Sequence, residues 1–170
     1  VDLMCDLGAY AALVGGGVPV LGAWMYNSIY KFGAYQFNCT NYFTNKTWVD
    51  AYRGAGRPEA TYAIERIVDE LAAEVGVDPM AIREKNWITH EEFPFTTVAG
   101  MTYDSGNYEA ATEKALQLFG YEELRAEQKR RRESNDPVQL GLGISTFTEM
   151  CGLAPSRILG ALNYGAGGWE

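Results

Sequence analysis

The stretch AYRGAGRPEATYAIERIVDELAAEVG, residues 51–76, predicts a loop followed by a long amphipathic helix. Pro58 suits the first turn of such a helix, and Gly76 suits its C-terminal cap. Apolar and charged side chains recur at helical spacing on opposite faces, so the apolar face is expected to pack on a core. The apolar positions are Ile64, Ile67, Val68, Leu71 and Val75, and the charged positions are Glu65, Arg66, Asp69, Glu70 and Glu74.

Strands and further helices are predicted on both sides of this helix. Sequence patterns indicate strands over 1–10, 34–43, 138–148 and 156–164, and helices over 18–30, 107–119 and 122–132. Asp78 and Pro79 are expected to begin another helix, and residues 89–102 are expected to be a connection. Because strands and helices are segregated rather than strictly alternated, the predicted fold class is α+β, with a mixed sheet and a central block of helices.

The length and charge of the chain limit its size and its partners. The 170 residues are enough for one compact domain. A net charge of −8 is poorly suited to holding a polyanion, so nucleic acid is not an expected partner. The one basic cluster, residues 129–132, lies among glutamates and is expected to be a solvated helix face.

Cysteine and histidine are too sparse to build a metal centre by themselves. Cys5, Cys39, Cys151 and His90 are widely spaced, which excludes a self-contained zinc or iron–sulfur site. An odd number of cysteines without a secretion signal fits a reducing compartment, and a cytoplasmic location is expected. The apolar run over 9–29 is interrupted by glycines and a proline, so no membrane span is predicted.

Both ends of the chain suggest a segment of something longer. A strand pattern is already running at residue 1, and the last predicted strand has no evident partner. We therefore expect residues 1–170 to be one partial domain that is truncated at both ends.

The loop over residues 51–60 has the composition of an anion site. It combines two glycines, two arginines and a helix N-terminus, whose free N–H groups and positive dipole end favour an anion. The spacing fits neither a Rossmann fingerprint, because Glu59 stands where a third glycine is needed, nor a P-loop. A loop that simply caps the helix fits the same composition equally well.

The residues YRGAGRPE, 52–59, resemble the active-site loop of the molybdenum hydroxylases, which include xanthine dehydrogenase, aldehyde oxidase and aerobic carbon-monoxide dehydrogenase. The similarity extends upstream to residues 44–46 and downstream to DPMAIREKN, residues 78–86, and covers the whole chain. The resemblance implies a partial segment of the large, molybdopterin-binding subunit, similar to that of carbon-monoxide dehydrogenase. It also implies that five residues of the loop face the cofactor or the substrate, with the main contacts made by the backbone of Arg53 and Gly54. These five residues are Ala51, Tyr52, Arg53, Gly54 and Ala55.

Two positions depart from the family pattern. Carbon-monoxide-oxidising members carry a cysteine where Gly54 stands, so their bimetallic chemistry is not supported here. Xanthine and aldehyde members tend to carry a phenylalanine where Ala55 stands, and alanine leaves a wider pocket. Arg57 is expected either to contribute to the site or to cap the helix or pair with Glu59, and Tyr52 is a candidate core residue as well as a site residue.

The resemblance also implies what this chain lacks. The family's Gly-Phe-Gly cofactor motif and its catalytic glutamate fall outside this segment, so we assign no catalytic residue and no metal ligand. Glu149 is expected to be structural. In the intact subunit the cofactor would be molybdenum–molybdopterin, in its cytosine dinucleotide form. The expected partners are the remainder of the large subunit and separate iron–sulfur and FAD subunits.

The predicted function is that of a segment from a molybdenum-dependent oxidoreductase, which hydroxylates a small substrate with water-derived oxygen. The segment alone is expected to be inactive and to hold no cofactor. The alternative from a different class is a non-catalytic structural or interaction fragment. A weaker alternative is a nucleotide-binding module that uses the loop over residues 54–56.

Overall fold

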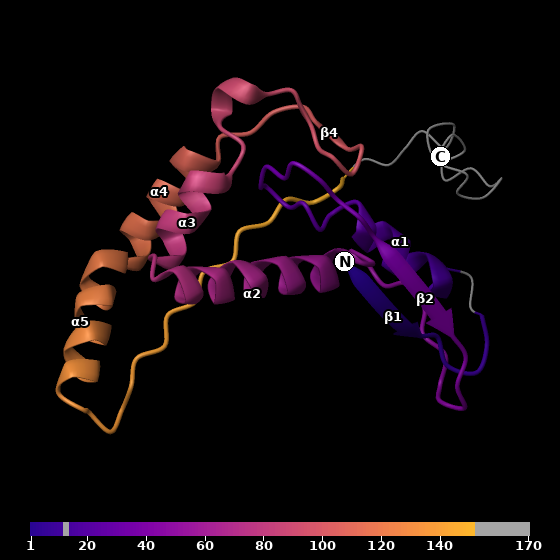
Figure 1. Ribbon diagram of the computed structural model, residues 1–170, viewed down its shortest axis with the longest axis horizontal. Coiled ribbons are helices and arrows are strands. Elements are labelled where there is room, and N and C mark those ends of the chain that lie inside the picture. The colour runs from indigo at the N-terminus through magenta and orange to yellow at the C-terminus, as the bar shows by residue number, and fades with distance from the viewer. Residues whose placement is uncertain (12–13, 152–170) are drawn as a thin grey trace.

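The computed structural model describes residues 1–11 and 14–151. Its long helix α2 joins two groups of elements: the β1–β2 pair and α1 lie at its N-terminal end, and α3, α4 and α5 lie at its C-terminal end (Figure 1). The order along the chain is β1 (Asp2–Asp6), η1 (Gly15–Gly17), α1 (Val18–Ala23), β2 (Asn38–Tyr42), α2 (Arg57–Val75), α3 (Pro79–Asn86), η2 (His90–Glu92), β3 (Phe95–Thr96), β4 (Thr102–Tyr103), α4 (Tyr108–Phe119) and α5 (Tyr121–Glu133).

Among residues 1–11 and 14–151, the strands form two small sheets, where one mixed sheet was expected. β1 pairs in parallel with β2, with Leu3 opposite Cys39, and β3 pairs antiparallel with β4 inside the expected connection. The segment over 138–148, predicted to be a strand, pairs with no strand among the described residues. The strand predicted over 156–164 lies outside the described residues.

Local sequence signals place the helix ends well. Gly56 and Gly76, at the two ends of α2, both adopt positive φ angles, which glycine tolerates without a steric penalty. Asn107 caps α4 by accepting a hydrogen bond from the Ala110 N–H. The basic cluster over 129–132 lies on α5 and is largely exposed, as predicted. The helix predicted over 18–30 is shorter, because α1 ends at Ala23 and turns follow it.

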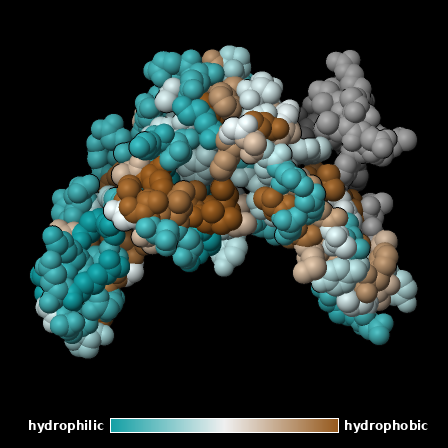
Figure 2. Space-filling model, in the orientation of Figure 1, coloured by the Kyte–Doolittle hydropathy of each residue, from teal (hydrophilic) through white to brown (hydrophobic). Residues whose placement is uncertain are grey.

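The predicted apolar face of α2 is only partly right. Ile64 is buried, but Ile67, Leu71 and Val75 are exposed to 61%, 48% and 54%, and the space-filling view shows a continuous hydrophobic band there (Figure 2). Glu65, predicted to face solvent, is 4% exposed. The face of α2 that packs on the core therefore includes Glu65 and excludes Ile67, Leu71 and Val75, which differs from the face that the apolar periodicity predicts.

A buried ion pair explains why Glu65 faces inward. Arg83 of α3 is fully buried, and its guanidinium lies 3.0 Å from the Glu65 carboxylate and 2.9 Å from that of Asp69. Tyr30 donates its hydroxyl proton to Glu65 at 2.6 Å, and the Thr146 N–H donates to the same carboxylate at 2.8 Å. This network attaches α3 and the segment near residue 146 to α2.

Among residues 1–11 and 14–151, two core clusters pack against the N-terminal half of α2. One cluster gathers around Ile64, and the other around Ala60. The first consists of Ile29, Tyr30, Ile64, Met80, Trp87 and Tyr121, and the second of Leu21, Met25, Tyr26, Ala60 and Met150. Because Ala60 is one turn from the start of α2, the second cluster fixes the loop that precedes the helix. Within residues 1–11 and 14–151, no helix is both long and apolar enough to span a membrane.

Asp78 caps α3 as predicted, and the structure gives it further partners. Its carboxylate accepts hydrogen bonds from the Met80 N–H at 2.8 Å and from the Tyr121 hydroxyl at 3.0 Å, and it pairs with Arg125 at 2.8 Å. Burial acts to raise the pKa of Asp78, but these hydrogen bonds and the Arg125 charge outweigh it, and the pKa is lowered.

We expect Asp78→Ala to lower the free energy of unfolding by about 1 kcal/mol, because an N-cap is lost. The lowered pKa means that the carboxylate's charge-dependent stabilisation is present above its ordinary pKa and is lost as pH falls through the folded-state pKa. Urea unfolding at neutral and acidic pH checks this. Asp78→Asn keeps a capping oxygen, so it should remove only the pH-dependent part; an unchanged acid dependence in that variant would contradict the assignment.

Candidate functional site: the loop before helix α2

The five residues singled out from the sequence lie together on the surface at the N-terminal end of α2. Ala51, Tyr52 and Arg53 are exposed, and Gly54 and Ala55 are half-buried. Tyr52 is 90% exposed, so its interpretation as a core residue is wrong. The loop therefore presents its first three side chains outward, where another molecule can reach them.

The two glycines of the loop have different roles. Gly56 is buried, and a Cβ atom there would lie 2.4 Å from the backbone nitrogen of Gly22 and 2.4 Å from the carbonyl oxygen of Val18. It therefore serves close packing of the loop on α1. Gly54 also has a positive φ, of 85°, but a Cβ there would meet nothing within 4 Å. Only Gly54 lies beside open space.

One prediction paired Arg57 with Glu59. In the structure Arg57 instead bonds to the loop and to residues 149–150. Its guanidinium donates to the carbonyl oxygens of Ala55 at 2.9 Å and Met150 at 3.1 Å. Its Nε lies 3.0 Å from the carboxylate of Glu149, although the geometry of this ion pair leaves the buried N–H without a hydrogen bond. Glu149 thus has a structural contact, and Arg57 ties the loop to residues 149–150.

A cavity of about 550 Å³ opens between the loop and the segment over 145–149. Arg53, Gly54 and Arg57 line one side of it, together with residues from the first two turns of α2. Residues 145 and 147–149 line the other side, and sequence reasoning missed this wall. The alternating pattern over 138–148 indicated that this segment is extended, but it did not indicate that the segment lies against the helix that follows the loop.

The start of α2 adds to the positive character of this cavity. Its N-cap is Gly56, which has no capping side chain. The Arg57 N–H donates to the Gly54 carbonyl oxygen at 2.9 Å and Pro58 has no N–H, so among the described residues the Glu59 N–H is the donor of the first turn that has no partner. The positive end of the helix dipole and Arg53 therefore both border this cavity. An anion fits this donor set, since Arg53 is exposed and Gly54 leaves room for close approach to the backbone.

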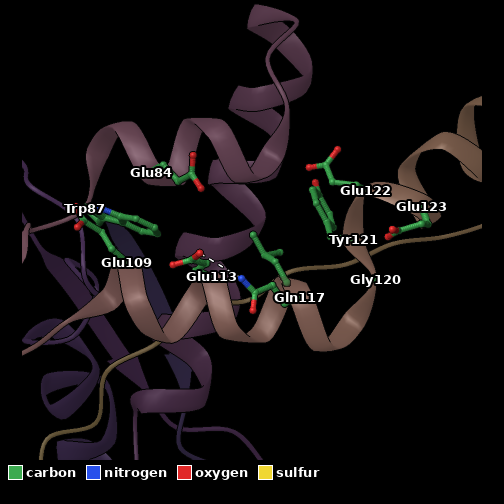
Figure 3. Close-up of a pocket in the computed structure, with 10 residues that line it drawn as sticks. Glu84, Trp87, Glu109, Glu113, Gln117, Gly120, Tyr121, Glu122 and Glu123 are labelled. Atoms are coloured by element: carbon green, nitrogen blue, oxygen red, sulfur yellow. Dashed lines mark hydrogen bonds between the residues drawn. The ribbon is translucent and has the colours of Figure 1, made fainter.

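A larger cavity has the opposite charge and does not suit an anion. It measures about 710 Å³ and lies between α3, α4 and the start of α5 (Figure 3). Its walls carry five glutamates, and the charge of these side chains repels a phosphate-bearing ligand. They are Glu84, Glu109, Glu113, Glu122 and Glu123. In the part of the chain that the structure describes, no group of three or more metal-binding side chains is positioned to hold a metal ion.

Comparisons with known proteins show that the chain is similar to parts of molybdenum-containing enzymes. Residues 1–87 match the protein family described as the molybdopterin cofactor-binding domain. The carbon monoxide dehydrogenase large chain of Hydrogenophaga pseudoflava is 46% identical over 117 residues, which cover 68% of this chain and 15% of that one. The nicotine 6-hydroxylase large subunit of Paenarthrobacter nicotinovorans is 30% identical over 153 residues, covering 83% of this chain and 18% of that one.

Solved structures agree with the sequence comparisons. The reconstituted CO dehydrogenase from Oligotropha carboxidovorans superposes with a TM-score of 0.78 and 36% identity, over 92% of this chain and 21% of that chain. In these comparisons the matched region spans between 15% and 21% of the relatives' own lengths.

Proposed function

Because this chain belongs to the molybdopterin cofactor-binding domain family, we propose that it forms one wall of the cofactor pocket in the large subunit of a molybdenum-dependent oxidoreductase. The intact enzyme would be of the carbon-monoxide, xanthine or aldehyde dehydrogenase type and would hydroxylate a small substrate with water-derived oxygen. The observation that carries this proposal is the open space at Gly54, beside Arg53 and the uncapped start of α2.

Each residue of the loop has a separate task in this proposal. Gly54 leaves the backbone accessible, and Arg53 donates charge-assisted hydrogen bonds to an anionic group or an electron-rich oxygen. Arg57 does not contact the cofactor in this proposal; its hydrogen bonds hold the loop against residues 149–150. Ala51, Tyr52 and Ala55 complete the cofactor- or substrate-facing surface. The bound molybdenum–molybdopterin group supplies the redox chemistry, and the protein binds and orients it.

The proposal includes the finer expectations drawn from the family. The cofactor is in the cytosine dinucleotide form, electrons leave through iron–sulfur and FAD subunits, and the complex is cytoplasmic. Gly54 has no side chain that could be a ligand where carbon-monoxide-oxidising members place a cysteine, so we expect no second metal bound at this position. The isolated 170 residues are expected to retain no cofactor and to turn over no substrate.

A non-catalytic interaction fragment remains the second candidate function. The exposed apolar band of Ile67, Leu71 and Val75 favours it, because such a surface on a soluble domain is typical of an interface. Purified intact subunit that contains no molybdenum by elemental analysis would favour this second function over the first.

Arg53→Ala in the intact large subunit is expected to weaken retention of molybdenum by about 10- to 100-fold, the range for losing one charge-assisted hydrogen bond. The melting temperature of the cofactor-free subunit should not change, since the Arg53 side chain is exposed. Molybdenum per subunit after dialysis, measured with thermal unfolding, checks both parts. Arg66→Ala, an exposed arginine farther along α2, is the matched control and should change neither. Full molybdenum retention in Arg53→Ala would contradict the role given to Arg53.

A further inference from the structure

The segment over 138–148 is an extended chain that lies along α2 after leaving α5 (Figure 1). It contains no charged residue and no proline. From residue 140 to 148 its side chains alternate, with the even positions half-buried and the odd positions exposed. This is the conformation and the burial pattern of a strand, although the described residues provide no neighbouring strand.

One edge of this segment is satisfied by side chains. Every main-chain hydrogen bond made by residues 138–148 involves an even-numbered residue. The carbonyl oxygens of Leu140 and Ile144 accept from Gln128 and Arg83, at 2.9 and 3.2 Å. Thr146 uses both its N–H, which donates to Glu65 at 2.8 Å, and its carbonyl oxygen. In a strand only alternate residues bond to a given neighbour, so these contacts occupy a single edge.

The opposite edge is open. Among residues 1–11 and 14–151, the N–H and C=O groups of Gly141, Gly143, Ser145 and Phe147 have no hydrogen-bond partner. Soluble proteins protect free strand edges with lysine, proline, bulges or a covering element. This edge has none of these within the segment, and two of its four residues are glycines, which let another backbone approach closely.

We propose that this edge pairs with a β-strand from the part of the large subunit outside residues 1–170. The partner is a neutral extended segment that bonds through its main chain and covers Phe147, which is 67% exposed. The relatives supply the reason to look in the same subunit, because more than three quarters of each matched large chain lies outside the aligned region. Ser145 and Phe147 also line the 550 Å³ cavity, so the added strand lies beside the proposed cofactor site.

Residue-resolved hydrogen exchange on the intact large subunit tests the pairing. We expect the amides of Gly143, Ser145 and Phe147 to exchange on the order of 100-fold more slowly than in an unstructured peptide of the same sequence. Exchange at the unstructured rate would overturn the proposal. The measurement is made on subunit with and without molybdenum, so a failure of cofactor binding and a failure of strand pairing are told apart.

A photo-crosslinker identifies the partner. Benzoylphenylalanine in place of Phe147 should give monomeric crosslinked subunit, with the crosslinked peptide outside residues 1–170. A covalent dimer, or a crosslink within residues 1–170, would overturn the assignment of the partner. Ser145→Pro should lower the melting temperature of the intact subunit because it removes an N–H from the paired edge, whereas Ser145→Ala keeps that N–H and should not. Equal melting temperatures for the two variants would also count against the pairing.

Discussion

Gly56→Ala is expected to destabilise the chain by about 3 kcal/mol or more, a substantial fraction of the roughly 5–15 kcal/mol stability of an ordinary domain. The added Cβ atom would lie 2.4 Å from two backbone atoms of α1, and neither can rotate away as a flexible side chain would. The positive φ of 81° adds strain for any residue with a Cβ. Thermal and urea unfolding of the unmodified chain and of the Gly56→Ala variant measure the loss of unfolding free energy.

Gly54→Ala is the matched control for this prediction. Its φ of 85° is nearly the same, but its Cβ would meet no atom within 4 Å. We expect a loss of about 1 kcal/mol from backbone strain alone. Similar losses for the two variants would mean that the contact with α1 does not account for the effect at Gly56.

Arg83→Met is expected to cost about 3–5 kcal/mol of unfolding free energy, because it leaves the buried carboxylate of Glu65 without its cation. The variant also removes donors to the carbonyl oxygens of Pro79 and Ile144. The segment near residue 146 should loosen as a result, which faster hydrogen exchange at the Thr146 amide would reveal.

Two comparison variants isolate the buried charge. Arg66→Ala removes an exposed arginine of α2 that pairs with Glu70, and surface pairs of this kind contribute about 0–1 kcal/mol. The double variant Glu65→Leu with Arg83→Met removes both buried charges and should recover part of the loss. A double variant that is no more stable than Arg83→Met would show that the unpaired carboxylate is not the cause.

Local chemistry made several elements predictable. Gly76 ends α2, Asp78 caps α3 and Asn107 caps α4, and each acts through contacts within a few residues along the chain. The extended conformation over 138–148 was also predictable from its alternation. Which strands pair with this segment could not be predicted, because strand pairing depends on residues far away in the sequence.

The orientation of α2 shows why periodicity was not enough. Its apolar residues recur at helical spacing, yet Glu65 is buried and Ile67 is exposed. The position of Arg83, 18 residues later, decides this, since a buried arginine needs a carboxylate partner. Nothing in the local pattern of α2 reveals that requirement.

The sequence by itself determined that a glycine-rich, arginine-bearing loop precedes a helix, because glycine and proline act on the backbone of their own residues. Only the tertiary structure decided which glycine lies beside a cavity. Gly54 and Gly56 have the same side chain and similar φ angles, and they differ only in what the rest of the chain places next to them: α1 against Gly56, and open space at Gly54.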